Sequence, residues 1–347
     1  MIWLTWRQHR VILAIGALGA LGLVVWMLVV EHDYASGRAA LTRACPSFGS
    51  TGPGGGPLTA GCDVVFSRIV QATDQADIIR VLLLAVPLVA GVLLGAPLVA
   101  GELEHDTVVL AFTQGISRTR WLVTRWLTVL APVVAAMAAL AVFLNWWFWH
   151  IQTSGDVSNF GLASSVAEGA SRIKPGTFDS TGIVLVAYAV FAVALGAALG
   201  AILRRTFWAG LVTVGAFATA RLLFVYWIRS HLLTPLYQPL GTMPLTSAPP
   251  IWVVTSGYRD VAGSRVPLTA ASIQHVTTLC SQASGATGSQ VYGVYEKCVA
   301  AHGIQFGTYY QPSSRFWVLQ WSEAALFVAA AVALFGVTLW AVRRWRA

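Results

Sequence analysis

The most prominent feature of the sequence is a series of long apolar runs separated by polar segments. Residues 11–30 and 81–100 contain no charge at all. About 20 apolar residues in a helix are enough to cross the hydrocarbon core of a bilayer. Four more runs reach this length: 126–149 and 181–203 without a charge, and 207–228 and 316–342 with one charge each, Arg221 and Glu323. The pattern predicts six membrane-spanning helices: 11–30, 81–100, 121–149, 181–203, 207–228 and 316–342.

Composition and the distribution of basic residues agree with a membrane protein of defined orientation. Of the 347 residues, 56% are hydrophobic and 10% are charged, whereas soluble domains carry about 25% charged residues. Ten basic residues cluster in short segments that directly flank the spans, which marks those segments as cytoplasmic. We therefore assign cytoplasmic segments to 1–10, 101–120, 204–206 and 343–347, and outer segments to 31–80, 150–180 and 229–315.

The predicted fold is thus an all-α integral membrane protein with cytoplasmic N- and C-termini and small disulfide-bearing extracellular loops. Within the outer segments, "STGPGGGP" (50–57) is expected to be irregular. The stretches "TAASIQHVTTLCSQA" (269–283) and "SQVYGVYEKCVAAHG" (289–303) have helical spacing. Two glycine pairs, Gly91/Gly95 and Gly196/Gly200, are expected to allow close helix packing.

All four cysteines fall in segments assigned to the exterior: Cys45 and Cys62 in the first, Cys280 and Cys298 in the last. Four cysteines allow three pairings. The local pairs Cys45–Cys62 and Cys280–Cys298 are the simplest in an oxidising compartment. A zinc site is the competing interpretation, but the chain has no CxxC motif and no tight Cys/His cluster.

The stretch "GELEHDTVVLAFTQGISRTRW" (101–121) concentrates charge at the end of the second predicted span. It holds Glu102, Glu104 and Asp106, although the chain has only 14 acidic residues. Carboxylates stabilise the N-terminus of a helix and destabilise its C-terminus. We therefore predict a separate short cytoplasmic helix over about 102–111. Ser117 is suited to cap the helix that follows.

Charges within a span are expensive in hydrocarbon and are therefore functional candidates. Arg221 and Glu323 have matching depths when counted along their helices from the outer side. We interpret them as an intramembrane charge pair. The alternative is that Arg221 binds an anionic group of a substrate.

Several other functions receive little support from the sequence. Glu102 and His105 have the i, i+3 spacing of di-iron helix motifs, but only one such motif is present, and we predict no metal site. No GxxxxGK[ST] motif occurs, so we predict neither ATP hydrolysis nor any catalytic residue in this chain. A membrane enzyme that uses Glu31 and Asp33, at the outer end of the first span, on a lipid-linked substrate is an alternative. The basic residues form no stripe that would bind nucleic acid.

Several stretches resemble the permease subunit of ABC transporters of the type-2 exporter class, in an actinobacterial branch. They are "MIWLTWRQHR", "GAPLVAGELEHDTVVLAFTQGISRTRWL", "VYWIRSHLLTP" and "YQPSSRFWVLQWSEAALFVAAAVAL". The resemblance implies that the elbow after the second span docks on a separate ATPase subunit. The positions it assigns to this coupling are Glu102, Glu104, Asp106, Thr107, Thr113, Ser117, Arg118 and Trp121.

The same resemblance implies the wider assembly. Two identical permease copies would work with two ATPase subunits in a bacterial cell membrane and export a substrate. The chain itself would hold no cofactor, because ATP and Mg²⁺ bind to the partner ATPase. A non-transporting sensor or immunity protein on the same scaffold is the other alternative.

Overall fold

The computed structural model shows a mostly helical protein. The described residues are 2–44, 60–104, 117–153, 172–173, 175–239, 251–260, 274–276, 278–280, 297–302 and 304–344. Within these residues, six helical segments are long and apolar enough to cross a membrane, in agreement with the number of spans predicted from the apolar runs. The segments 50–57 and 105–116 lie outside the described residues.

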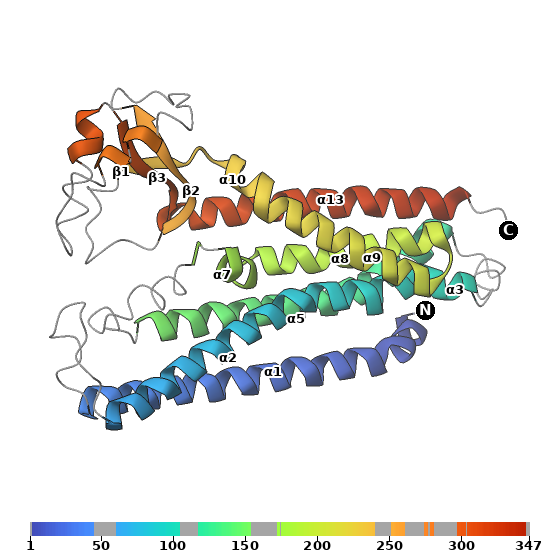
Figure 1. Ribbon diagram of the computed structural model, residues 1–347. Helices are drawn as coiled ribbons and strands as arrows, with labels where there is room; N and C mark the ends of the chain where they lie inside the picture. Colours follow the sequence, from blue (N-terminus) through green and yellow to red (C-terminus); the bar gives the residue numbers. More distant parts are fainter. Residues whose placement is uncertain are drawn as a thin grey trace.

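The spanning segments are helices of 20 to 43 residues, and two of them are interrupted by a π-helical turn. Their bounds are α1 Ile2–Ala44; α2 Ala60–Ala90 with η1 Gly91–Gly95 and α3 Ala96–Glu104; α5 Arg118–Thr153; α8 Val184–Leu203; α9 Thr206–Leu223 with η3 Phe224–Ile228 and α10 Arg229–Leu232; and α13 Phe316–Arg344. α1 begins and α13 ends at the same end of the bundle (Figure 1).

The first outer segment differs from the predicted loop, because both flanking helices continue far beyond the apolar runs. α1 extends to Ala44 and α2 begins at Ala60. A helix of 43 residues is about 64 Å long, roughly twice the hydrocarbon thickness of about 30 Å. α1 and α2 therefore form an antiparallel hairpin that protrudes from the bundle (Figure 1).

A heptad seam explains why this hairpin is helical. Its buried positions are separated alternately by three and four residues, or by a full heptad of seven, as in a coiled coil. On α1 they are Met27, Val30, Tyr34, Gly37 and Leu41, and on α2 they are Cys62, Ile69, Ala72, Ala76, Ile79 and Leu83. Gly37 lets the helices approach, since a Cβ there would lie 3.1 Å from Ile69.

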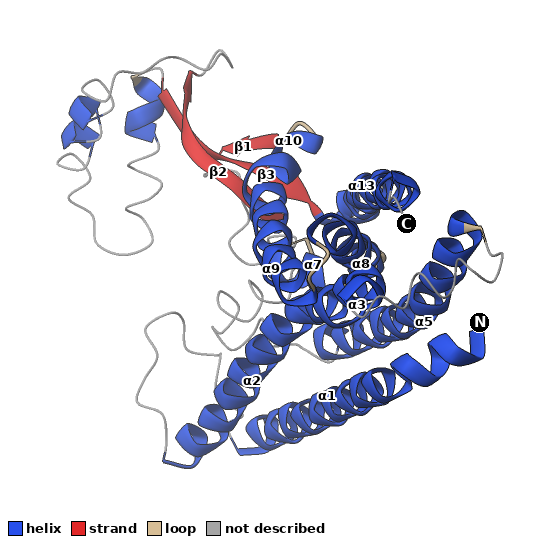
Figure 2. Cartoon of the chain, turned by 90° about the vertical axis from the view of Figure 1, so that its right-hand side faces the viewer, coloured by secondary structure: helices blue, strands red, loops and turns tan. Residues whose placement is uncertain are grey.

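α8 is the central helix of the bundle, and α13, α9, α5, α3 and η1 pack around it (Figure 2). Its sequence is apolar on every side, as expected for a fully surrounded helix. The two predicted glycine pairs, Gly91/Gly95 and Gly196/Gly200, lie where the two helices pack against each other. A Cβ on Gly196 would lie 2.4 Å from the carbonyl oxygen of Gly91, and a Cβ on Gly95 would lie 2.6 Å from that of Val193.

The last outer segment carries a three-stranded antiparallel sheet, which corrects the all-α prediction. The strands are β1 Leu236–Pro239, β2 Ile251–Asp260 and β3 Ile304–Pro312, in the order β1-β3-β2. Of the two predicted helices, the structure describes short helical pieces at 274–276, 278–280 and 297–301. A disulfide joins Cys280 to Cys298, as predicted.

The "YQPSSRFW" stretch attaches this sheet to the bundle. It runs from the end of β3 through a 3-10 turn, η5 Ser313–Arg315, into α13. Gln311 donates to the carbonyl oxygen of Leu233 (2.7 Å), directly after α10. Arg315 donates to the carbonyl oxygen of Thr234 (2.7 Å) and to the side chain of Gln311 (2.8 Å). The sheet is thereby held against the ends of both α10 and α13.

Candidate functional site

The acidic end of α3 is tied to two neighbouring helices within the chain. Arg125 of α5 donates to Glu102 (2.5 Å) and to the carbonyl oxygen of Leu98 (3.2 Å). Its guanidinium also lies over the Trp121 ring, 5.2 Å from the centroid. Arg125 is 8% exposed, so this ion pair is shielded from water more than a surface pair would be.

Glu104 caps the N-terminus of the neighbouring helix α9. Its Oε2 accepts hydrogen bonds from the backbone N–H (3.2 Å) and the hydroxyl (2.6 Å) of Thr206, the first residue of α9. This corrects the predicted separate helix, because Glu102 and Glu104 are the last turn of α3, which continues the second span. The dipole argument still applies, since the carboxylate sits at the N-terminus of α9 instead of at that of its own helix.

The start of α5 is fixed as well. Ser117 accepts a hydrogen bond from the backbone N–H of Arg120 (3.3 Å), which is the predicted capping contact. Arg118 donates to the carbonyl oxygens of Val342 (3.4 Å) and Arg343 (3.1 Å) at the end of α13. A cation is favourable there because these carbonyls lack helical partners.

The two ends of the 105–116 elbow are therefore anchored to α5, α9 and α13. The remaining predicted coupling residues, Asp106, Thr107 and Thr113, lie within the elbow and outside the described residues, as does His105.

A second candidate site is a buried charge cluster at the opposite end of the bundle. Arg229 of α10 binds Glu323 of α13 through two hydrogen bonds, Nε to Oε2 (2.8 Å) and Nη2 to Oε1 (2.9 Å). Arg229 also donates to Asp179 of α7, Pro175–Ser180. Arg221 of α9 lies 2.8 Å from Asp179 and 3.6 Å from Glu323. Tyr188 of α8 donates to Glu323.

The cluster balances two guanidinium groups against two carboxylates. Among the described residues, one nitrogen of each arginine, Nη1, has no hydrogen-bond acceptor. Each guanidinium lies over an aromatic ring: that of Arg221 is 3.6 Å from the Tyr188 centroid, and that of Arg229 is 4.4 Å from the Phe178 centroid. Cation–π attraction offsets part of the lost solvation.

Gln320 positions the short helix that supplies Asp179. Its amide nitrogen donates to the carbonyl oxygens of Phe178 (2.9 Å) and Thr181 (3.0 Å), and its oxygen accepts from the backbone N–H of Val184 (3.1 Å). Gln320 therefore caps the end of α7 and the start of α8 together. Gly182, with φ of +76°, makes the turn between them.

The sequence prediction named Arg221 and Glu323 and missed Arg229, Asp179 and Tyr188. Arg229 was placed in the outer segment, yet it is fully buried. In a regular helix i+7 returns to nearly the same face and i+8 does not. The π turn η3 adds one residue between Arg221 and Arg229. Arg229, at i+8, therefore lies on the face that i+7 occupies in a regular α-helix. No periodicity argument for an α-helix would reveal this.

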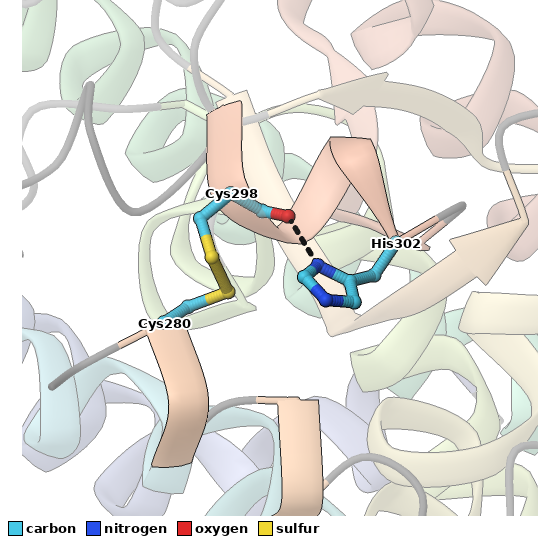
Figure 3. A group of neighbouring side chains, drawn as sticks. All are labelled: Cys280, Cys298 and His302. Carbon is cyan, nitrogen blue, oxygen red and sulfur yellow. Dashed lines mark hydrogen bonds between the residues drawn. A yellow bond between two sulfur atoms is a disulfide. The ribbon is translucent and has the colours of Figure 1, made fainter. Parts of the chain in front are cut away.

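A third group consists of Cys280, Cys298 and His302, whose donor atoms lie within 4.8 Å of one another (Figure 3). The two sulfurs are joined in a disulfide, and His302 Nδ1 contacts the carbonyl oxygen of Cys298 (2.8 Å). Metals bind thiolates, so this group does not offer a sulfur ligand set. Cys62 is also disulfide-bonded, while Cys45 lies outside the described residues.

Comparison with known families identifies the family of the chain. Residues 15–229, more than half of the chain, match the family described as ABC-2 membrane transporter related. The chain belongs to this family. Comparisons with curated proteins and with solved structures give no match.

Membership makes this ABC-2 protein a multi-pass membrane permease, a transporter subunit of a kind that is generally not enzymatic and that associates with an ATPase subunit. The matched region includes the anchored ends of the elbow and four of the five cluster residues. Glu323 is the exception, because α13 lies beyond the match. The ABC-2 match thus covers most of the cluster and assigns it no role.

Proposed function

We propose that this ABC-2 permease uses ATP hydrolysis in a separate subunit to export a substrate, and that the 105–116 elbow docks on that ATPase. The observation that carries the proposal is the anchoring of both ends of the elbow. Glu102–Arg125 links it to α5, Glu104–Thr206 to α9, and Arg118 to α13. A displacement of the elbow would reach three spans through these contacts.

The roles of the coupling residues differ under this proposal. Glu102 and Glu104 are engaged inside the chain, so we assign them the transmission of motion into the spans. Asp106, Thr107 and Thr113 are left as the docking residues, while Ser117 and Trp121 hold the start of α5. The chain would act as a homodimer in a bacterial cell membrane, with the termini and the elbow in the cytoplasm. Its placement in the actinobacterial branch remains a prediction from the resemblance.

The structure does not favour the membrane enzyme. Glu31 and Asp33 both lie inside α1, two residues apart. Residues at i and i+2 of a helix do not face each other, so α1 does not present these carboxylates as a facing pair.

The experiment is co-expression of the permease with candidate ABC ATPases, followed by co-purification and an assay of ATPase activity with candidate substrates. Reversing Glu102, Glu104 and Asp106 to lysine should weaken association or remove the stimulation by substrate, while insertion in the membrane persists. Asp63→Lys is the matched control, because Asp63 is exposed at the opposite end of α2. A triple variant that associates and responds like the unaltered protein would refute the coupling role.

A further inference from the structure

A polar groove runs along one side of the α1/α2 hairpin and has no role in the proposed coupling. It has a volume of about 300 Å³, and its lining residues are Asp33, Ser36, Arg68, Gln71, Ala72 and Gln75. This volume lies at the lower end of the range for small-molecule sites. A small polar group fits within this volume.

The position of the groove follows from the heptad seam. Five of its lining residues directly precede seam residues: Asp33 precedes Tyr34, for example, and Arg68 precedes Ile69. Asp33 and Arg68 hold the heptad position just before a, where coiled coils usually carry charges that pair between the helices. Here the Asp33 carboxylate and the Arg68 guanidinium form no ion pair or hydrogen bond with another side chain of the described residues. The groove thus presents one acid and one base, both available to a ligand.

The same flank becomes aliphatic one turn deeper. One turn below Asp33 lies Val29, and below Gln75 follow Ile78 and Leu82. These three side chains are 43 to 52% exposed. The change occurs at the edge of the apolar runs, where a span leaves the hydrocarbon and enters the headgroup region. The hairpin therefore offers a charged groove at headgroup depth above an apolar face.

We propose that this groove binds the headgroup of a zwitterionic phospholipid with a primary ammonium, such as phosphatidylethanolamine. Arg68 binds the phosphate, Asp33 accepts hydrogen bonds from the ammonium, and Gln71 and Gln75 complete the polar contacts. The acyl chains lie along Val29, Ile78 and Leu82. An anionic headgroup without an ammonium would leave Asp33 unpaired and be repelled by it. Binding of the lipid does not depend on the proposed function. The assignment of the lipid to the outer leaflet does, because it rests on the topology proposed there.

The test uses the full-length protein in nanodiscs that contain equal amounts of phosphatidylethanolamine and phosphatidylglycerol with identical acyl chains. Lipids that stay bound after transfer to detergent are counted by native mass spectrometry. We expect phosphatidylethanolamine to be retained about fivefold over phosphatidylglycerol, as for one charge-assisted hydrogen bond at a partly exposed site. Asp33→Asn should abolish this preference. Arg68→Gln should lower retention of both lipids.

Two matched controls, Arg43→Gln and Asp63→Asn, change exposed charges of the same hairpin outside the groove and should leave the preference intact. If Arg68→Gln does not fold, Gln71→Trp keeps both charges and should reduce retention by filling the groove. Free O-phosphoethanolamine at the concentration of the lipid should displace little, because it lacks the acyl contacts.

Equal retention of the two lipids would overturn the proposal, as would a preference that survives Asp33→Asn and Gln71→Trp. Full displacement by O-phosphoethanolamine would also overturn it. No ATPase takes part in the assay, so its failure is separate from failure of the proposed coupling.

Discussion

The buried charge cluster leads to a quantitative prediction about Arg229 and Glu323. Both side chains are fully buried and are joined by two hydrogen bonds. Glu323→Leu leaves two guanidinium groups with one carboxylate, and Arg229→Met leaves two carboxylates with one guanidinium. Breaking a buried pair from one side costs about 3–5 kcal/mol. We expect each single variant to lose this much free energy of unfolding.

The double variant Arg229→Met/Glu323→Leu should be far less affected. It retains Arg221 and Asp179, which are 2.8 Å apart and balance each other. Replacing a buried pair with apolar side chains is often neutral or stabilising. The double variant should therefore lose at least about 3 kcal/mol less than the sum of the single losses.

The assay is reversible unfolding in mixed micelles by titration with sodium dodecyl sulfate, followed by the fluorescence of the 15 tryptophans. Ser322→Ala, which changes a half-buried neighbour outside the cluster, is the control. Additive losses in the double variant would refute the reasoning, because they would show that the two residues do not interact.

A second cycle with Arg221→Leu and Glu323→Leu separates the structural from the substrate-binding role of Arg221. If the role is structural, the double variant should recover folded yield and transport together. If Arg221 binds an anionic substrate, the double variant should regain folded yield but remain inactive in transport.

Three further predictions concern stability and local structure. Replacing Cys280 and Cys298 with serine should lower the stability of the outer module by about 3 kcal/mol, since the bridge closes an 18-residue separation; mass mapping that finds free thiols there in the native protein would contradict this. Glu104→Ala should cost about 1 kcal/mol and speed amide exchange in the first turn of α9, and unchanged exchange would argue against the cap. Gly196→Leu should abolish folded yield because a Cβ already meets the Gly91 carbonyl, whereas Gly215→Leu should be tolerated, since nothing lies within 4 Å of a Cβ there.

The number of spans was predictable because each apolar run exceeds the length that a bilayer requires. The helical hairpin was not predicted, although its heptad seam was present in the sequence. Polar residues such as Glu31 and Asp33 mark the end of the hydrocarbon, and they were interpreted as the end of the helix as well. Packing between the two helices continues the structure beyond the membrane, so that helix length and apolar length differ.

The sites were predictable only in part, for physical reasons that differ. A charge within a span is costly in hydrocarbon. Arg221 and Glu323 could therefore be identified as candidates from the sequence. Asp179 and Arg229 lie at helix ends, where charges are common, and only the tertiary fold buries them. Glu104 stabilises a helix that begins 102 residues later, a contact that no local rule could reveal. The sheet depends on strands separated by long segments and was equally inaccessible.

The central claim, that the 105–116 elbow meets an ATPase, is tested most directly by cross-linking. No described cysteine carries a free thiol, so a cysteine introduced as Thr113→Cys can be labelled selectively with a photoreactive probe. Ser256→Cys on the exposed part of β2, at the far end of the molecule, is the matched control. The account predicts a cross-link between position 113 and the co-purified ATPase and none from position 256. Cross-linking from position 256 alone, or from neither position in an intact complex, would contradict it.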